Sequence, residues 1–285
     1  MKNLLSILKK ILNIITVVVV ITVLIVLFLK FQNNKKKEIL NKALRNFREN
    51  DNTMILLILG QSNAANYTEK RYTTDKNIAT FFGNELKQAK DPLPGASGSK
   101  GSIWIPFSER IIEESAIERV LIICIAEGSS TVFDWSAKGK YNHKLVNTLQ
   151  QLQAHKIMPT HILWQQGEQD NALQTKRENY KSSFNQILQT LRRYAIDAPV
   201  FLSLTSYNPI AKNRINNEIR EAQKQLAQKN NNNVYLGPDT DIYIGKEFRY
   251  DGIHFSNKAV LNIAEDWKET LLNYTQKNQK NSILK

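Results

Sequence analysis

The stretch Met54-Ile55-Leu56-Leu57-Ile58-Leu59-Gly60-Gln61-Ser62-Asn63 decides the fold of this chain. Its first six residues are Met, Ile and Leu, the composition of a strand that is buried on both faces of a parallel sheet. Gly60 permits a sharp turn directly after the strand. Ser62 then comes at the carboxyl end of the strand, where open α/β sheets build their sites. The stretch therefore predicts a central strand that delivers a serine to the edge of a sheet.

Short apolar runs continue to alternate with longer amphipathic segments after this strand. Buried strands are predicted at 120–126, 161–165 and 200–204, with a weaker strand at 234–236. Helices are predicted at 105–117, 142–156, 176–194 and 213–229, and from a cap at Ser256 to about residue 274. This alternation predicts an α/β fold, a three-layer α/β/α doubly wound parallel sheet of the flavodoxin-like kind, preceded by one transmembrane helix.

The N-terminal region divides by composition into a basic tail at 1–10, an apolar run at 11–29 and a basic connector at 30–52. The apolar run has no charged residue, and as a helix it would be roughly 28 Å long, close to the thickness of a hydrocarbon core. A buried core helix and a cleaved signal peptide are the alternatives. Both are weaker, because the run is long and lysines follow it where a small-residue cleavage site would stand. We expect a membrane anchor, followed by one catalytic domain at 53–276 and a polar tail at 277–285.

The charge of the chain is concentrated near this anchor. The first 50 residues hold ten Lys or Arg and two Glu, which is +8 of the total net charge of +13. That position favours lipid headgroups over nucleic acid, and no nucleic-acid-binding motif is found. The positive-inside rule would place the domain in the cytoplasm, whereas a short basic N-terminus before an apolar run is typical of a signal anchor. We expect a single-pass membrane protein with an extracytoplasmic domain.

The sequence gives no support for a metal or cofactor. The four histidines, at positions 143, 155, 161 and 254, include no pair at the spacing of a zinc site. Cys124 lies inside an apolar run and is expected in the core. We predict a metal-independent and cofactor-independent protein, and nothing in the sequence indicates its oligomeric state.

Three short polar motifs follow or flank predicted strands: Gly60-Gln61-Ser62-Asn63, Trp164-Gln165-Gln166-Gly167-Glu168 and Asp251-Gly252-Ile253-His254. A serine hydroxyl becomes a useful nucleophile when a base takes its proton, so a histidine with an orienting carboxylate is required. A short irregular segment from Asp251 to His254 can fold the aspartate onto the imidazole.

In this order the motifs resemble the SGNH hydrolases, in particular the branch of the sialate O-acetylesterases and carbohydrate esterase family six. The resemblance covers roughly residues 54–274. It implies Ser62 as the nucleophile, His254 as the general base and acid, and Asp251 as the group that orients His254.

The resemblance also implies donors to the oxyanion of the tetrahedral intermediate. They are the backbone N–H of Ser62, the N–H of Gly128 and the side chain of Gln166. The second motif reads Gly128-Ser129-Ser130 where relatives usually have paired glycines, so Ser129 or Ser130 are alternatives to Gly128.

Further residues are expected around these groups. Gln61 and Asn63 are assigned supporting roles. Glu168 is either a second acid or a structural hydrogen-bond acceptor, and the supporting role is favoured. Trp135 is a candidate substrate rim on which a sugar could stack, and the loop 95–102 is a candidate side of the cleft.

The expected function is that of a membrane-anchored serine esterase that removes O-acetyl groups from sialic acid, a polysaccharide or a similar glycan through an acetyl-serine intermediate. Its expected partners are the O-acetylated glycan and the membrane. A glycan O-acetyltransferase with the same triad is one alternative, and a catalytically inactive glycan-binding module is another. The complete set of Ser62, Asp251 and His254 argues against the inactive module.

Overall fold

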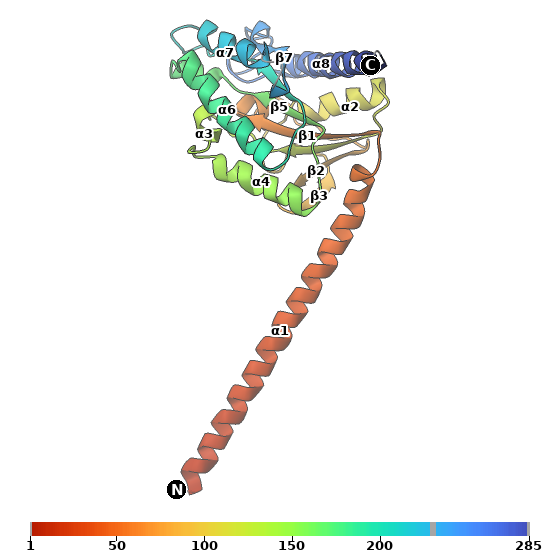
Figure 1. Cartoon of the computed structure of the whole chain (residues 1–285). Helices are drawn as coiled ribbons and strands as arrows, with labels where there is room; N and C mark the ends of the chain where they lie inside the picture. The colour runs from red at the N-terminus through yellow and green to blue at the C-terminus, as the bar shows by residue number, and fades with distance from the viewer. Residues whose placement is uncertain (1, 229–231, 284–285) are drawn as a thin grey trace. The chain divides into compact units, whose positions relative to one another are not determined.

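A computed structural model describes residues 2–228 and 232–283 of the protein (Figure 1). The chain divides after Arg45 into two compact units. Helix α1, Lys2–Arg48, runs without a break through the expected tail and apolar run and through most of the expected connector. Its segment Ile15–Arg48 is long and apolar enough to cross a membrane, with a mean hydropathy of 2.6 in its most apolar window. A signal sequence near the N-terminus meets the same criteria of length and composition.

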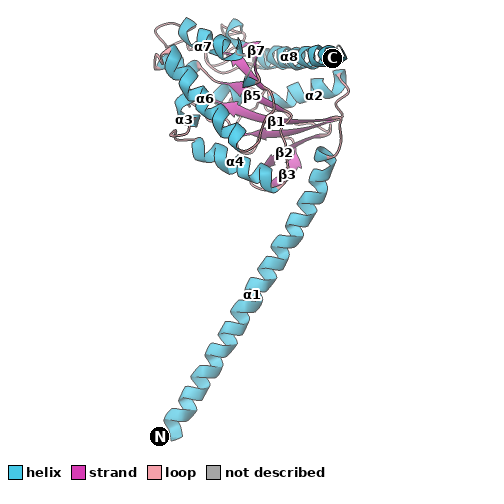
Figure 2. Cartoon of the chain, in the orientation of Figure 1, coloured by secondary structure: helices cyan, strands magenta, loops and turns pink. Residues whose placement is uncertain are grey.

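The larger unit is built on a seven-stranded sheet in the order β3-β2-β4-β1-β5-β6-β7 (Figure 2). The strands are β1 Thr53–Gly60, β2 Ile78–Phe82, β3 Glu85–Gln88, β4 Arg119–Cys124, β5 His161–Gln165, β6 Val200–Leu204 and β7 Val234–Asp239. Every neighbouring pair is parallel except β2 and β3, which form an antiparallel hairpin at one edge. The five predicted strands are present. The hairpin of β2 and β3 was not predicted, and its antiparallel pairing corrects the expectation of a wholly parallel sheet.

Helices cover both faces of the sheet, as a doubly wound fold requires. Their bounds are α2 Trp104–Glu114, α3 Val132–Trp135, α4 Asn142–Ala154, α5 Glu168–Ala172, α6 Arg177–Arg193, α7 Asn217–Gln228 and α8 Asn257–Ile283. On one face α2 packs against α8, and on the other α6 packs against α7 and α3 (Figure 1). Two single turns of 3-10 helix, η1 Ser62–Ala64 and η3 Thr240–Ile242, follow β1 and β7. The predicted three-layer architecture is confirmed.

Strand β1 is buried along its whole length because it lies in the middle of this sheet. Leu56 and Ile58 belong to the core cluster that contains Trp104 of α2 and Trp267 of α8. The two indole rings are 5.8 Å apart. The continuous apolar run of β1 is therefore the sequence of a strand with helices on both sides.

Local capping groups explain where two predicted helices begin. The side-chain oxygen of Asn216 accepts the N–H of Glu218 at 2.9 Å, so α7 starts at Asn217, later than expected. Ser256 Oγ accepts the N–H of Ala259 at 3.3 Å, as the predicted cap of α8. Helix α8 continues to Ile283, so the segment expected to be a frayed tail is helical up to that residue.

The register of the central strands brings three site segments to one edge of the sheet. Gly60 at the end of β1 lies opposite Gln165 at the end of β5, and Ile58 lies opposite Cys124 at the end of β4. The residues that follow these three strands are Ser62, Gly128 and Gln166. They therefore leave the sheet side by side, at the carboxyl edge where this class of fold carries its sites.

Candidate active site

The turn that presents Ser62 depends on Gly60. Its φ is +142°, and a β-carbon there would lie 2.0 Å from the carbonyl oxygen of Gln165 on the neighbouring strand. Both facts exclude a larger residue. The Gln61 N–H then donates to the same oxygen at 3.1 Å, and Ser62 begins η1 with 5% of its surface exposed. Ser62 is thus fixed just beyond the carboxyl end of β1, the strand between β4 and β5.

Asp251 and His254 form a closed pair in the loop before α8. Asp251 Oδ2 lies 2.7 Å from Nδ1 of His254, and Oδ1 accepts the backbone N–H groups of His254 at 2.7 Å and Ile253 at 3.0 Å. Burial works to raise the pKa of Asp251, but the hydrogen bonds from His254 and Ile253 outweigh it and lower that pKa to about 2. The carboxylate therefore stays ionised at neutral pH and orients the ring, which leaves Nε2 as the nitrogen for proton transfer.

Asn63 joins the serine turn to the histidine loop. Its Nδ2 donates to Glu168 Oε1 at 2.7 Å and lies 3.4 Å from the carbonyl oxygen of Ile253, the residue before His254. Asn63 is itself buried. One side chain adjacent to Ser62 thus contacts both the third motif and the backbone next to His254.

Arg249 holds the backbone of the loop that carries His254, and this role was not predicted from the sequence. It is fully buried, and its guanidinium donates to the carbonyl oxygens of Tyr243 at 2.7 Å, Ile253 at 2.7 Å and Thr240 at 3.0 Å. The ring of Phe255 lies 4.2 Å from the guanidinium carbon. Burial lowers the pKa of Arg249 to about 10. The sequence shows only an arginine five residues before His254, and the burial that requires these partners is visible in the structure alone.

Glu168 has the contacts of a structural acceptor. Its Oε1 accepts from Asn63, its Oε2 accepts the Gly167 N–H at 3.1 Å, and burial raises its pKa. The carboxylate that contacts His254 is that of Asp251, not that of Glu168. This arrangement favours the supporting role over the second acid.

The side chains of Gln166 and Gln61 already form hydrogen bonds with other residues around the site. Gln166 Nε2 donates to Asp170 Oδ2 at 2.5 Å and to the Ser130 carbonyl at 3.0 Å, and it lies 3.3 Å from Gln61 Oε1. Gln61 Oε1 also accepts the Gln169 N–H at 3.1 Å, which caps α5 from another segment. The amide hydrogens of Gln166 therefore have acceptors already, and its expected donation to an oxyanion would require one of these bonds to break.

The N–H of Gly128 is likewise occupied. It donates to the hydroxyl of Ser97 at 2.7 Å, from the loop that was expected to form one side of the cleft. Of the alternatives, the N–H of Ser130 donates to the Glu127 carbonyl at 3.3 Å. The N–H of Ser62 has no acceptor among the hydrogen bonds found in the described residues.

The expectation for Trp135 is wrong. Its side chain is fully buried, and its Nε1 donates to Ser130 Oγ at 2.9 Å, so no sugar can stack on it. The physical reason is the short helix α3, whose Thr131 and Asp134 form a capping box and turn Trp135 inward. The neighbouring Phe133 is the exposed aromatic residue, with 55% of its surface accessible.

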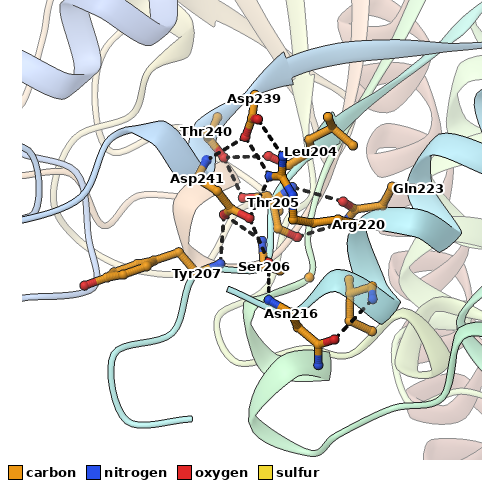
Figure 3. A network of polar contacts seen from close by, with 12 residues as sticks. Leu204, Thr205, Ser206, Tyr207, Asn216, Arg220, Gln223, Asp239, Thr240 and Asp241 are labelled. Atoms are coloured by element: carbon orange, nitrogen blue, oxygen red, sulfur yellow. Dashed lines mark hydrogen bonds and ion pairs between the residues drawn. The ribbon is translucent and has the colours of Figure 1, made fainter. Parts of the chain in front are cut away.

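A network of charged and hydroxyl groups holds β6, β7 and α7 together behind the site (Figure 3). Arg220 of α7 contacts Asp239 at 2.6 Å and Asp241 at 2.9 Å. Asp241 in turn accepts the Ser206 hydroxyl at 2.7 Å. The network adjoins the site because the carbonyl of Thr240, in its middle, is one of the three acceptors of Arg249. The loop that carries His254 is therefore anchored to a cross-linked region of the fold.

Among the described residues, no three His, Cys, Asp or Glu side chains gather as a possible metal site. The site is instead assembled from amide, hydroxyl, carboxylate and imidazole groups on five segments of the larger unit.

Comparisons with known proteins identify the family and the fold of the chain. Residues 52–273 match the family described as carbohydrate esterase, sialic acid-specific acetylesterase. Similar solved structures include an Arabidopsis thaliana protein, with a TM-score of 0.62, 17% identity, and coverage of 78% of this chain and 98% of that one. A search of curated proteins returns no relative of the chain.

Two further solved structures are similar to the chain. NanS has a TM-score of 0.59 and 15% identity, over 79% of this chain and 98% of its own. A carbohydrate acetylesterase from Xanthomonas citri has a TM-score of 0.54 and 17% identity, over 75% of this chain and 54% of its own. The likenesses show the fold, and the family match covers nearly the whole larger unit. The chain belongs to the carbohydrate esterases of the sialic acid-specific acetylesterase family, and it is a carbohydrate O-acetylesterase with an SGNH hydrolase fold.

Proposed function

We propose that this esterase removes O-acetyl groups from a glycan through an acetyl-serine intermediate on Ser62. His254 Nε2 takes the proton of Ser62 Oγ as the oxygen attacks the acetyl carbonyl, and it returns the proton to the departing sugar oxygen. Water then hydrolyses the acetyl-serine with His254 again as the base. The observation that carries the proposal is the Asp251–His254 pair, held at 2.7 Å and linked to the serine turn through Asn63.

The acidic partner of His254 suits this mechanism. With its pKa lowered to about 2, Asp251 is an anion throughout the neutral range and stabilises the imidazolium that forms during attack. A carboxylate held by two backbone N–H groups also fixes the orientation of the ring, because its own position is set by the loop.

We further propose that helix α1 anchors the enzyme in a membrane and that the catalytic unit lies on the extracytoplasmic side, because a short basic N-terminus precedes the apolar run as in a signal anchor. The exposed apolar side chains of α1, such as Leu24 and Phe28, support the anchor.

The test compares acetate release from O-acetylated sialic acid, O-acetylated xylan and an aryl acetate by the full chain and by its Ser62→Ala variant. We expect release that disappears in the variant while its thermal unfolding is unchanged. Mass spectrometry after rapid acid quench should find an acetyl group on Ser62 in the wild type. Turnover that survives in Ser62→Ala would overturn the assignment of the nucleophile.

A further inference from the structure

We propose that Tyr67 is a catalytic residue of this esterase: its hydroxyl donates to the oxyanion of the tetrahedral intermediate, while its ring holds the imidazole of His254. The inference rests on the proposed function of Ser62 and His254. It assigns a second donor beside the N–H of Ser62, because the Gly128 N–H and the Gln166 side chain already donate to other groups.

The ring of Tyr67 is stacked on the ring of His254. The two centroids are 5.1 Å apart and the planes differ by 22°. The carboxylate of Asp251 fixes the edge of the imidazole, and Tyr67 covers its face. The base is therefore held in two directions, and a proton gained by His254 would place a cation against an aromatic face, which is favourable.

Hydrogen bonds on both sides of Tyr67 hold its backbone in place. The preceding residue, Asn66, is fully buried, and its amide side chain donates to the carbonyls of Leu93 at 3.0 Å and Ala96 at 3.1 Å. The carbonyl of Tyr67 itself accepts the hydroxyl of Tyr250 at 3.2 Å. The backbone of Tyr67 is thus held on both sides of its Cα.

Two glycines leave room for the ring and place its hydroxyl in the site. A β-carbon at Gly98 would lie 2.7 Å from Cε2 of Tyr67, and one at Gly128 would lie 2.6 Å from its hydroxyl oxygen. Tyr67 therefore reaches from His254 at its ring to Gly128 at its hydroxyl. Gly128 is the residue at which the family pattern places an oxyanion donor.

The hydroxyl of Tyr67 is also the donor that remains available there. The Gly128 N–H donates to Ser97 Oγ, and Gln166 Nε2 donates to Asp170 and Ser130. Within residues 2–228 and 232–283, Tyr67 Oη makes no hydrogen bond, so its proton is free to meet a developing charge. A preformed donor of this kind is what an oxyanion requires.

In the proposed step, the bond from Ser62 Oγ to the acetyl carbon forms, and the π electrons of the carbonyl move onto its oxygen. The serine proton passes to Nε2 of His254. Tyr67 keeps its proton and donates it as a hydrogen bond to the oxyanion, beside the N–H of Ser62. When the carbonyl re-forms, the sugar oxygen leaves with the proton from His254.

Three variants of the full chain separate the hydroxyl from the ring. Tyr67→Phe removes the hydroxyl and keeps the stacked ring, so we expect kcat for aryl acetate to fall about 100-fold with KM nearly unchanged. Tyr67→Leu removes both and should lower kcat further. Tyr194→Phe, at the C-terminal end of α6, removes a tyrosine hydroxyl outside the site and should leave kcat unchanged. Thermal unfolding should be the same for Tyr67→Phe and the wild type.

A second readout does not depend on the acetyl substrate. An aryl alkylphosphonate phosphonylates an activated serine, and its oxygen occupies the oxyanion position, so Tyr67→Phe should slow phosphonylation of Ser62 by a similar factor. Wild-type kcat and phosphonylation rate in Tyr67→Phe would overturn the inference, as would an equal loss of kcat in Tyr194→Phe. A wild type that is phosphonylated but hydrolyses no acetyl ester would instead refute the proposed substrate, and the Tyr67→Phe comparison would still decide the role of Tyr67.

Discussion

Asn63, the residue after the proposed nucleophile, donates its side-chain amide to Glu168 Oε1 over 2.7 Å, and both side chains are buried. Burial raises the pKa of Glu168, and the hydrogen bond from Asn63 opposes this shift because it favours the charged carboxylate. The same amide lies near the carbonyl of Ile253. The contact thus connects a buried carboxylate, the serine turn and the histidine loop.

Replacement of Asn63 by alanine should therefore damage both stability and turnover. The carboxylate of Glu168 would lose a partner at a buried position, which typically costs about 1 to 3 kcal/mol. We expect a lower free energy of unfolding in urea and a kcat reduced by about 10-fold or more, since the two halves of the site are no longer tied. Asn179→Ala, at an exposed position on α6, is the matched control and should change neither. Equal effects of the two variants would contradict the coupling.

Arg249 should be essential for the position of His254. Arg249→Met keeps a similar volume but leaves three carbonyl oxygens without their donor, so we expect a loss of about 3 kcal/mol or more in the free energy of unfolding. Arg249→Lys keeps the charge but brings one nitrogen to three acceptors, and it should recover only part of the stability and of kcat. Arg193→Met, at an exposed position, serves as the control. A full recovery by lysine would show that charge alone matters.

Gly128 should tolerate no side chain for a steric reason. A β-carbon there would lie 2.6 Å from the Tyr67 hydroxyl, so Gly128→Ala should displace Tyr67 and lower kcat at least 10-fold. The contrast is Gly83→Ala, where φ is +60° and nothing lies within 4 Å. That change should cost about 1 kcal/mol of stability through backbone strain and leave kcat intact. Wild-type kcat in Gly128→Ala would show that the pocket is wider than the contacts indicate.

Helix α1 should hold the enzyme in the membrane fraction. We expect the full chain to stay in the pellet after alkaline carbonate extraction, whereas a chain that begins at Asn46 should be soluble and retain its kcat on aryl acetate. Protease added to cells with a permeable outer barrier should cleave the catalytic unit if it is extracytoplasmic. A mature protein whose intact mass lacks the N-terminal segment would identify a cleaved signal sequence instead.

The parts of the fold predicted from sequence are those with local signals. Strands β1 and β4 contain apolar runs of five or more residues, β5 contains the shorter run Ile162 to Trp164, and a central parallel sheet needs such runs. Strand β3 was missed because its side chains are mostly exposed and polar. Its signal was the pair Gly83 and Asn84, both at positive φ, which is the two-residue turn of a hairpin.

The residues of the site likewise divide into those with a local sequence signal and those without one. Ser62, Asp251 and His254 lie in motifs that can be read from neighbouring residues. The bonds from Arg249 to Thr240 and from Gly128 to Ser97 connect separate segments, so no local pattern contains them. Trp135 was misplaced because its orientation follows from a one-turn helix too short for a periodic pattern to reveal.

Asp91 should give the enzyme a pH-dependent stability. Its carboxylate accepts the N–H groups of Tyr72 at 2.9 Å and Ser102 at 3.0 Å, and the Ser102 hydroxyl at 2.8 Å. Burial nevertheless raises its pKa to about 6, above the ordinary value of about 3.9. The stability that follows from a raised carboxyl pKa is complete below about pH 4 and is lost as the pH rises through 6, by up to roughly 3 kcal/mol.

Asp91→Asn isolates this effect, because the amide oxygen can accept both N–H groups and the amide nitrogen can donate to the Ser102 hydroxyl. We expect the wild type to lose free energy of unfolding relative to this variant between pH 4.5 and pH 8, measured in urea at both values. A difference between the two proteins that stays constant with pH would contradict the raised pKa. Since Asp91 and Ser102 close the loop that carries Ser97 against Gly128, the variant should also flatten any loss of kcat that accompanies the loosening of this loop at high pH.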